Sequence, residues 1–392
     1  MDPATAARLR DRALRALSAG RPEMAPQEAA IPVLHYLDPA RFARELRTLR
    51  RHPVPVAAAA ELARAGDHVA VRRLGVPLLA VRGDDGVLRA FLNVCRHRGA
   101  QVVPDGPGCG ARRFACPYHA WTYGSDGALR GVPQRDGFPG LDTVAAGLRP
   151  LAVAEAAGVV WVLPEPACAG HDLRAQLGPL AVELEAMGLG THVPFAPRRL
   201  DLQCNWKLLV DGAFEAYHFK VAHRETIAPL FADNQQVIDE FGLNRRLYLV
   251  KAGLDAAAAP AAQDFRPREH GNLLYFFFPG TTLLVQGDHA QLGHWEPLAP
   301  DRSAVHEFTL LPEAPAGDKA LRHWERNVAL YRQTLAEDYR LAESVQAGLA
   351  SGANEALRFG RFEFAAPRFH AQLEASCAAG DATAMATPSA AR

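Results

Sequence analysis

The sequence lacks the features that would place it in a membrane or on a nucleic acid. No segment approaches the run of about eighteen apolar residues that a membrane-spanning helix needs. Residues 1–8 are polar and helix-like, without the apolar core of a secretion signal. The 43 basic residues equal the 43 acidic residues in number, so the net charge favours no nucleic-acid or anionic-membrane partner.

Cysteine is also scarce, with six among 392 residues. Four of them lack the regular spacing of a disulfide framework, namely Cys109, Cys168, Cys204 and Cys377. Scattered free thiols persist in a reducing compartment, so we predict a cytoplasmic protein. The other two, Cys95 and Cys116, each have a histidine two or three residues further on.

The length and the secondary-structure signals indicate more than one domain. A chain of 392 residues with 49% apolar residues exceeds the usual single domain and can bury sizeable cores. Leucines at helical spacing predict helices in residues 1–50, and strand-like runs fill residues 51–165. Residues 166–378 carry strand-like runs at 246–250, 272–278, 281–286 and 304–311 and a long helix at 319–349, and a flexible tail is expected at 379–392.

Two short motifs, Cys95-x-His97 and Cys116-x-x-His119, supply four ligands for a soft or borderline metal. Hairpin dipeptides at 85–86 and 126–127 flank them, so both motifs are expected in loops between strands. Two thiolates on one iron and two imidazoles on the other describe a Rieske [2Fe–2S] cluster. The alternative for the same ligand types is a structural Cys2His2 zinc site.

The stretch from Cys95 to Trp121 resembles the Rieske domain of ring-hydroxylating oxygenases. The 18 residues between His97 and Cys116 exceed the family's usual gap, and a Pro- and Gly-rich turn can absorb the surplus. Cytochrome-complex Rieske proteins carry an additional disulfide between the two loops. Gly99 and Tyr118 stand where those cysteines are expected, which favours the oxygenase type.

A second candidate metal site begins with His218 and His223. Five residues apart, they point about 140° from one another on an ideal helix. They can share a metal only if the helix ends or bulges between them. By themselves, two histidines in a polar stretch are more often surface or satisfied core residues than metal ligands.

Asp338 is the candidate third ligand, on the predicted C-terminal helix. A carboxylate on a buried face costs several kcal/mol unless it is paired or bound to a metal. The alternatives are a salt bridge to a buried arginine or a half-exposed helix. Two histidines and one carboxylate form the facial triad of non-haem Fe(II) oxygenases. The expected buried stripe consists of Trp324, Val328, Tyr331, Leu335, Asp338, Ala342, Val345 and Leu349.

The motifs together resemble the catalytic domain of the large (alpha) subunits of Rieske non-haem iron oxygenases, aromatic-ring-hydroxylating dioxygenases included. The resemblance rests on Asn-Trp-Lys at 205–207, Glu-x-Tyr-His-x4-His at 215–223 and Glu-Asp at 337–338. It implies an α+β fold: an all-β Rieske domain (51–165) inserted early in a helix-grip catalytic domain (166–378) with an antiparallel sheet and a long C-terminal helix. The helices of 1–50 are expected to pack on the catalytic domain.

The resemblance also implies residue roles. His218, His223 and Asp338 would bind mononuclear Fe(II), with Asp338 and Glu215 as the catalytic residues. Glu215 occupies the position of a carboxylate that links an iron-ligating histidine to a cluster histidine of a neighbouring subunit. A homotrimer, with or without a small beta subunit, is therefore expected. Gly212 departs from the family, in which many members carry Asn there, so no side-chain role transfers to it.

The implied function is that of a terminal oxygenase. Electrons from a ferredoxin or flavin reductase and O2 would serve to hydroxylate, dihydroxylate or dealkylate a small organic substrate, with an aromatic compound favoured. Glu rather than Asp at position 215 resembles members acting on betaine- or carnitine-like compounds, so a quaternary ammonium substrate stays open. A non-enzymatic Rieske electron carrier fused to a ligand-binding domain is the other class, but such a protein has no need of Asp338.

Aromatic residues of the predicted catalytic domain are candidates for a substrate pocket, and the alternative is that they are core residues. Only one parity of the run Phe276-Phe277-Phe278 can face inward in a strand. An aromatic pocket would suit an aromatic ring or, through cation–π contact, a quaternary ammonium. The other candidates are Phe231, Phe241, Tyr248 and Trp295.

Overall fold

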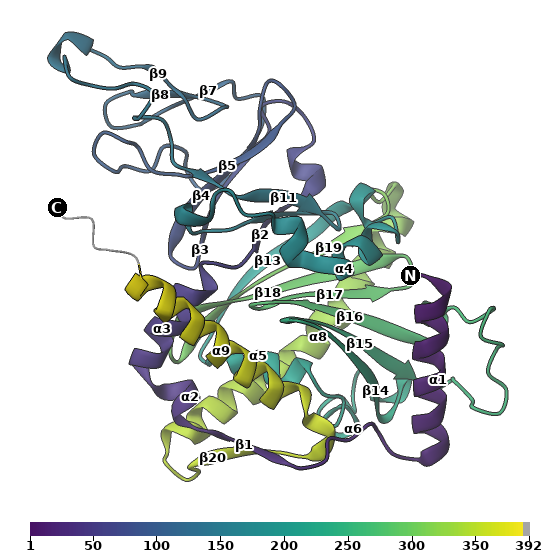
Figure 1. The fold of residues 1–392 in the computed structure, drawn as a ribbon. Helices are drawn as coiled ribbons and strands as arrows, with labels where there is room; N and C mark the ends of the chain where they lie inside the picture. The colour runs from purple at the N-terminus through teal and green to yellow at the C-terminus, as the bar shows by residue number, and fades with distance from the viewer. Residues whose placement is uncertain (387–392) are drawn as a thin grey trace. The chain divides into compact units, whose positions relative to one another are not determined.

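The computed structural model describes residues 1–386 and divides the chain into two compact units (Figure 1). Residues 50–194 form one of them, here called the inserted unit. Residues 1–49 and the chain from Phe195 onward form the other, here called the main unit. The division falls after Pro194, later than the expected 165, because α4 (Leu173–Glu185) packs against β11 (Val153–Ala156) of the inserted unit.

The inserted unit is built mainly from three small sheets, as its strand-like sequence predicts. The 85–86 and 126–127 dipeptides form the turns of the β4–β5 and β8–β9 hairpins. Both hairpin turns place a glycine at positive φ, 77° at Gly86 and 81° at Gly127. The five-stranded sheet has the order β10 (Pro150–Leu151), β5 (Leu88–Leu92), β4 (Val76–Arg82), β3 (His68–Arg73), β6 (Gly106–Gly108). The three-stranded sheets are β11, β12 (Val159–Val162), β2 (Val54–Ala58) and β7 (Arg113–Ala115), β8 (Thr122–Gly124), β9 (Leu129–Gly131).

The main unit contains a seven-stranded sheet in which the strands β14 to β19 follow one another antiparallel. Its order is β13 (Val193–Leu202), β19 (Arg302–Leu311), β18 (His289–Ala299), β17 (Thr281–Gln286), β16 (Gly271–Phe277), β15 (Asn244–Lys251), β14 (Phe231–Phe241). The four strands expected from sequence correspond to β15, β16, β17 and β19. The other three were not predicted, because β14 and β18 carry many polar residues and β18 includes Gly293 and Pro297.

Three helices of the main unit bear on the metal site. They are α5 (Trp206–Ala213), α8 (Gly317–Ala350) and α9 (Ala365–Ala386), and α8 extends the long helix expected at 319–349 by a residue or two at each end. α5 contacts β18, α8 and α9, so it lies at the junction of sheet and helices. Figure 1 shows α8 running across the sheet of the main unit. This antiparallel sheet with a long C-terminal helix agrees with the expected helix-grip arrangement.

The N-terminal helices belong to the main unit. They are α1 (Pro3–Ala19), α2 (Leu34–Leu37) and α3 (Pro39–Leu49), and α3 packs against α9. β1 (Ala29–Pro32) pairs with β20 (Ala356–Phe359), so an early segment and a late segment of the chain form one small sheet. α9 continues to Ala386, so the first part of the predicted tail is helical, and residues 387–392 lie outside the described residues.

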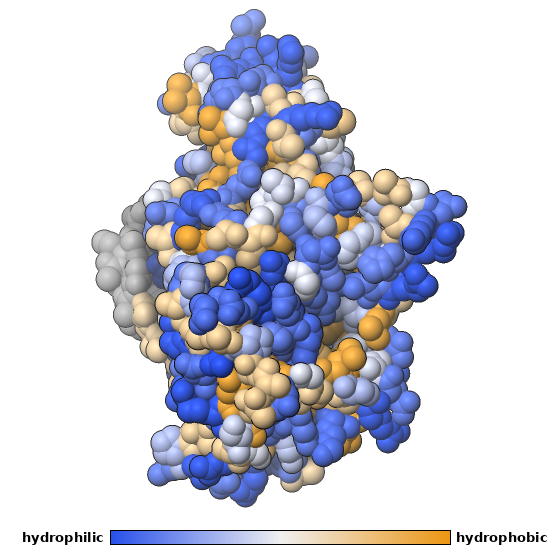
Figure 2. Space-filling model, turned by 90° about the vertical axis from the view of Figure 1, so that its right-hand side faces the viewer, coloured by the Kyte–Doolittle hydropathy of each residue, from blue (hydrophilic) through white to orange (hydrophobic). Residues whose placement is uncertain are grey.

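Within residues 1–386, no helix combines the length and the apolar run needed to cross a bilayer. The face drawn in Figure 2 is mainly hydrophilic, with small apolar areas scattered over it. Such an arrangement is usual, since much of any protein surface is apolar.

Candidate metal centres

The two Cys/His motifs occupy loops of the inserted unit that share one pattern of backbone hydrogen bonds. In each loop, the cysteine N–H donates to the carbonyl five residues later, and the cysteine carbonyl accepts from the residue four later. The repeated pattern presents the two cysteines in equivalent settings, each with a histidine two or three residues further on. The bonds join Cys95 N to Ala100 O (2.8 Å), Gly99 N to Cys95 O (3.0 Å), Cys116 N to Trp121 O (2.8 Å) and Ala120 N to Cys116 O (2.9 Å).

The four side chains of these loops fit a [2Fe–2S] cluster. Cys95 and Cys116 are each 3% exposed and form no disulfide, and the rings of His97 and His119 lie 4.6 Å apart. The buried Nδ1 atom of His97 has no hydrogen-bond partner among the described residues, as a metal-ligating nitrogen requires. The ring of Trp121 stacks on His97 at 4.8 Å and 7° and holds its orientation.

Tyr123 is a neighbour of the cluster loops that sequence reasoning treated only as part of a strand. Its fully buried hydroxyl lies 3.3 Å from Cys95 Sγ and accepts a hydrogen bond from the backbone N–H of Arg96 at 2.9 Å. A cysteine bound to iron is a thiolate and cannot donate, so the hydroxyl of Tyr123 would donate to the sulfur. Hydrogen bonds to cluster sulfurs tune the reduction potential.

The second site forms where the helical path after α5 breaks. α5 ends at Ala213, and the next helix, α6 (Phe219–Ala222), is a single turn with His218 and His223 at its two ends. Their Nε2 atoms lie 3.1 Å apart, because α6 ends directly before His223, so histidines five residues apart can share one metal. The apolar side chains of Tyr217 and Val221, in this same stretch, are 57% and 75% exposed.

Asp338 completes the group from α8. Its Oδ1 lies 3.1 Å from His223 Nε2 and 3.4 Å from His218 Nε2. The ligand atoms of these three residues all lie within 4.8 Å of one another, and they form the one such cluster among residues 1–380. The structure thus brings together the three residues selected from the sequence, and their donor set suits Fe(II) with positions left open.

The expected buried stripe on α8 needs correction. The Asp338 side chain is 32% exposed and Val345 is 40% exposed. The buried face instead includes polar residues that bond to other elements, because it packs on a polar part of the sheet. The position of Asp338 is therefore explained by its contacts with the two histidines rather than by burial on a wholly apolar helix face. The buried residues of α8 are Val328, Thr334, Glu337, Tyr339, Ala342, Gln346 and Leu349.

Each candidate iron-ligating histidine has a carboxylate at its other ring nitrogen. Glu215 contacts His218 Nδ1 through Oε1, and its Oε2 accepts from the backbone N–H of His218 at 3.0 Å. Glu337 Oε2 lies 2.8 Å from His223 Nδ1. A proton on each Nδ1 donates to a carboxylate and leaves Nε2 as the metal ligand. Glu337 was not selected from the sequence, where its only signal was the Glu-Asp pair at 337–338.

The same contacts shift the pKa values of the metal-free site. Burial disfavours protonated His218, but the carboxylates of Asp338 and Glu215 outweigh it and raise its pKa to about 10. The pKa of His223 is also raised, because Asp338 and Glu337 outweigh burial. Burial raises the pKa of Asp338, but both histidines outweigh it and lower that pKa. Without a metal, protons supply the positive charge that the site requires.

Buried polar contacts hold the start of α5 in position. The Asn205 side chain accepts from Lys207 N, which caps the helix, and its amide donates to the carbonyls of Tyr36 (2.8 Å) and Pro300 (2.7 Å). The ammonium of Lys207 donates to Glu45 Oε2 at 2.7 Å, and both side chains are 1% exposed. The Asn-Trp-Lys motif thus anchors the helix that leads into the iron site.

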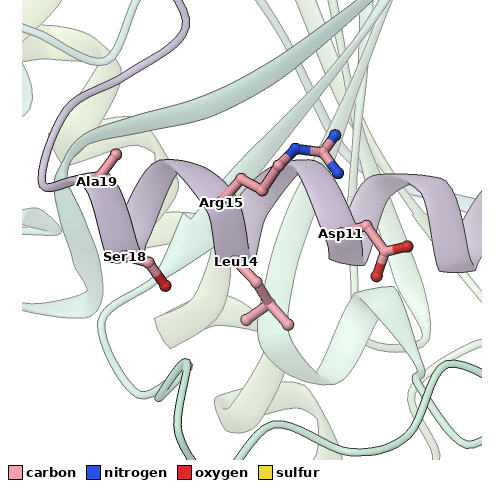
Figure 3. A pocket seen from close by; sticks show the side chains of 5 residues that line it. All are labelled: Asp11, Leu14, Arg15, Ser18 and Ala19. Atoms are coloured by element: carbon pink, nitrogen blue, oxygen red, sulfur yellow. The ribbon is translucent and has the colours of Figure 1, made fainter.

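The aromatic run of β16 belongs to the core. Phe276 and Phe277 are fully buried, and Phe276 packs edge to face on Phe214 and Phe369. A shallow hollow elsewhere on the main unit is lined only by residues of α1, as Figure 3 shows. None of the residues that line it belongs to the metal site.

Comparisons with known proteins identify the family. Residues 52–146 match the model of the Rieske [2Fe-2S] domain, and residues 189–379 match that of the ring hydroxylating alpha subunit, catalytic domain. The oxygenase subunit of carnitine monooxygenase from Escherichia coli K12 is 32% identical over 83% of this chain and 86% of that protein. The oxygenase subunit of glycine betaine monooxygenase from Chromohalobacter salexigens is 30% identical over 86% of this chain and 83% of that protein.

Comparison with a solved structure shows that the fold is also shared. A quaternary ammonium Rieske monooxygenase in complex with L-carnitine superposes with a TM-score of 0.75 at 26% identity, over 90% of this chain and 96% of that one. The chain belongs to the alpha subunits of the Rieske-type ring-hydroxylating oxygenases. It is therefore the terminal component of an oxygenase, with a Rieske cluster and a mononuclear iron, and not an electron carrier alone.

Proposed function

We propose that this protein is the oxygenase component of a monooxygenase for a quaternary ammonium compound. The observation that carries the proposal is the similarity, over more than four fifths of both chains, to oxygenase subunits named for carnitine and glycine betaine. The glutamate at position 215 supports the same substrate class. This proposal takes the place of the aromatic substrate that the ring-hydroxylating resemblance favoured.

The charges of the iron site support a cationic substrate. Three carboxylates surround the two histidines, because Glu215 and Glu337 bond to them and Asp338 faces both. With neutral histidines and one divalent iron, these groups leave a net charge of about −1. A cation is attracted to such a site, most strongly where water is excluded.

Tyr331 is the candidate to contact the ammonium group. It lies two helical turns before Asp338 on α8, and residues seven apart share one helix face. Burial and the nearby carboxylates of Glu307 and Asp338 raise the pKa of Tyr331 well above its usual value. An aromatic ring among carboxylates is a favourable environment for an alkylammonium through cation–π attraction.

The residues of the two centres have separate tasks in this mechanism. When bound, the cluster transfers single electrons and the iron binds and activates O2. Cys95, Cys116, His97 and His119 would hold the cluster. His218, His223 and Asp338 would hold the iron from one side and leave its other positions open. Glu215 fixes the His218 ring by accepting from Nδ1, which keeps Nε2 directed at the metal.

We infer a homotrimer in which electrons pass from one subunit's cluster to the next subunit's iron through Glu215. The surface beside Glu215 is apolar and unusually exposed, because Tyr217, Val221 and Leu230 are 57%, 75% and 53% exposed. An interface would bury these side chains. The exposed ring of Tyr118, stacked on His119 at 3.7 Å, offers the matching contact of a neighbouring cluster.

A reductase or ferredoxin would supply the electrons to this assembly. All six cysteines are free, which supports the expected cytoplasmic location.

A substrate screen tests the proposal. The purified protein, reconstituted with a reductase and NADH, is given L-carnitine, glycine betaine and choline in parallel with naphthalene and biphenyl. We expect O2 uptake coupled to a hydroxylated or dealkylated product with a quaternary ammonium compound. Turnover of the aromatic hydrocarbons alone would overturn the substrate class and leave the oxygenase assignment intact.

Asp338→Ala provides the matching control for the iron site. This variant should keep the visible spectrum of the cluster, lose mononuclear iron and lose turnover. Full iron content and activity in Asp338→Ala would contradict the assigned ligand set.

A further inference from the structure

We propose that Glu337 is a positioning residue that sets the iron affinity of this site by holding His223. The inference rests on the iron site proposed above and assigns a task to a side chain outside that ligand set. Glu337 immediately precedes Asp338 on α8, so one turn of helix supplies both a ligand and the support of a second ligand.

The geometry around Glu337 is that of a metal site's supporting carboxylate. Its Oε2 lies 2.8 Å from His223 Nδ1 and accepts from Thr226 Oγ1 at 2.7 Å. Thr226 follows His223 by three residues, and its backbone N–H donates to the His223 carbonyl at 3.0 Å. Histidine, threonine and glutamate therefore form a closed set of hydrogen bonds that fixes one orientation of the imidazole ring.

The burial of this carboxylate needs a compensating cation. The Glu337 side chain is 10% exposed, and His223, its only ion-pair partner among residues 1–380, is 1% exposed. Within the part of the chain that the structure describes, neither lysine nor arginine neutralises Glu337, although a buried carboxylate without a cation costs several kcal/mol. A divalent iron on His223 Nε2 would supply that charge through the ring. The placement of Glu337 is thus explained by a metal on the far side of His223.

The two supporting carboxylates differ in their surroundings. Glu215 adjoins the exposed residues Tyr217 and Val221, where a second subunit is proposed to dock. Glu337 instead is a buried residue of α8 and bonds to His223 and Thr226. We therefore assign iron affinity to Glu337 and electron transfer to Glu215, and the two tasks can be separated by measurement.

The test is anaerobic titration of the iron-depleted holo-cluster protein with Fe(II) against a competing chelator. Glu337→Gln retains an oxygen that can accept from His223 Nδ1 but removes the charge, and Glu337→Ala removes both. We expect the dissociation constant to rise about 10- to 100-fold in Glu337→Gln and further in Glu337→Ala. Thr226→Val keeps the carboxylate and should weaken binding by less.

Controls separate this task from a purely structural one. The visible spectrum of the cluster and the thermal midpoint report folding, and Glu325→Gln, at an exposed position of the same helix, should bind Fe(II) as wild type does. The absorption of Co(II) bound in place of Fe(II) should change in Glu337→Gln, because the donor strength of His223 changes. Glu215→Gln should affect Fe(II) affinity less than Glu337→Gln.

The possible results distinguish the two proposals. If wild type binds no Fe(II), or His223→Ala binds it equally well, the iron site itself is wrong. If wild type binds Fe(II) through His223 while Glu337→Gln and Glu337→Ala match its affinity, only the task of Glu337 is refuted. Should the Glu337 variants fail to fold, an unchanged affinity in Thr226→Val overturns the inference.

Discussion

Removing the hydroxyl of Tyr123 should lower the reduction potential of the Rieske cluster. This buried hydroxyl is 3.3 Å from Cys95 Sγ and is the one side-chain hydrogen-bond partner of that sulfur among residues 1–380. Reduction adds negative charge to the cluster, so a donor to the sulfur stabilises the reduced form more than the oxidised form. Tyr123→Phe removes the donor and keeps the ring.

The size of the shift follows from the strength of one hydrogen bond. A protein hydrogen bond contributes about 0.5–1.5 kcal/mol. A tenfold change in equilibrium equals about 1.36 kcal/mol, and for a one-electron couple it equals about 59 mV. The expected decrease for Tyr123→Phe is therefore about 20–65 mV. Loss of the acceptor for Arg96 N should also lower the free energy of unfolding by about 1–3 kcal/mol.

Potentiometric titration followed by the visible spectrum measures the shift. Tyr118→Phe is the control, because its ring stacks on His119 while its hydroxyl makes no hydrogen bond within residues 1–380. We expect the control to keep the wild-type potential. An unchanged or higher potential in Tyr123→Phe would refute the assignment of its hydroxyl as a donor to Cys95.

Three further predictions concern the main unit. Glu215→Gln should retain the cluster, the iron and the proposed trimer, but stopped-flow measurements should show slower reoxidation of the reduced cluster by O2 and substrate. A wild-type rate of reoxidation would contradict the proposed electron route through Glu215. Glu45→Gln should destabilise the protein by about 3–5 kcal/mol in urea unfolding, because the ammonium of Lys207 stays buried without its partner. In metal-free protein, the pKa of His218 is raised from a usual 6.5 to about 10. Protonated His218 therefore stabilises the folded state, and this stabilisation is fully present below pH 6.5 and is lost as the pH rises toward 10. Urea unfolding at pH 6.5 and 9 in chelator should show that decrease in wild type and a smaller one in His218→Gln.

Local patterns were enough to predict the cluster loops. A ligand motif, a hairpin turn and a strand each depend on residues close in sequence, so Cys95-x-His97 and Cys116-x-x-His119 could be placed between strands without coordinates. The hairpins at 85–86 and 126–127 formed where Asp-Gly indicated them. The long helix at 319–349 was also predicted, because its apolar spacing continues over many turns.

The strands β14 and β18 were missed for a physical reason. β18 pairs on both sides, with β17 and β19, and its pairing is sustained by buried polar contacts such as Gln291 to Thr309 at 2.7 Å. A sequence with such residues shows no alternation of apolar and polar side chains, so the strand can be recognised only from its pairing with the neighbouring strands.

Taken alone, the sequence determined the candidate ligands of this protein: two thiolates and two imidazoles for a cluster, and two histidines with one carboxylate for an iron. Residue type and short spacing were enough for the cluster motifs and the two histidines, whereas Asp338 was selected from its place on a predicted helix and from the family resemblance. The tertiary structure decided how the ligands meet. His218 and His223 meet because the single helical turn between them, α6, ends directly before His223, and Asp338 joins them while partly exposed. Glu337 lies against a histidine 114 residues away, a contact that long-range packing of α8 creates and that no local pattern encodes.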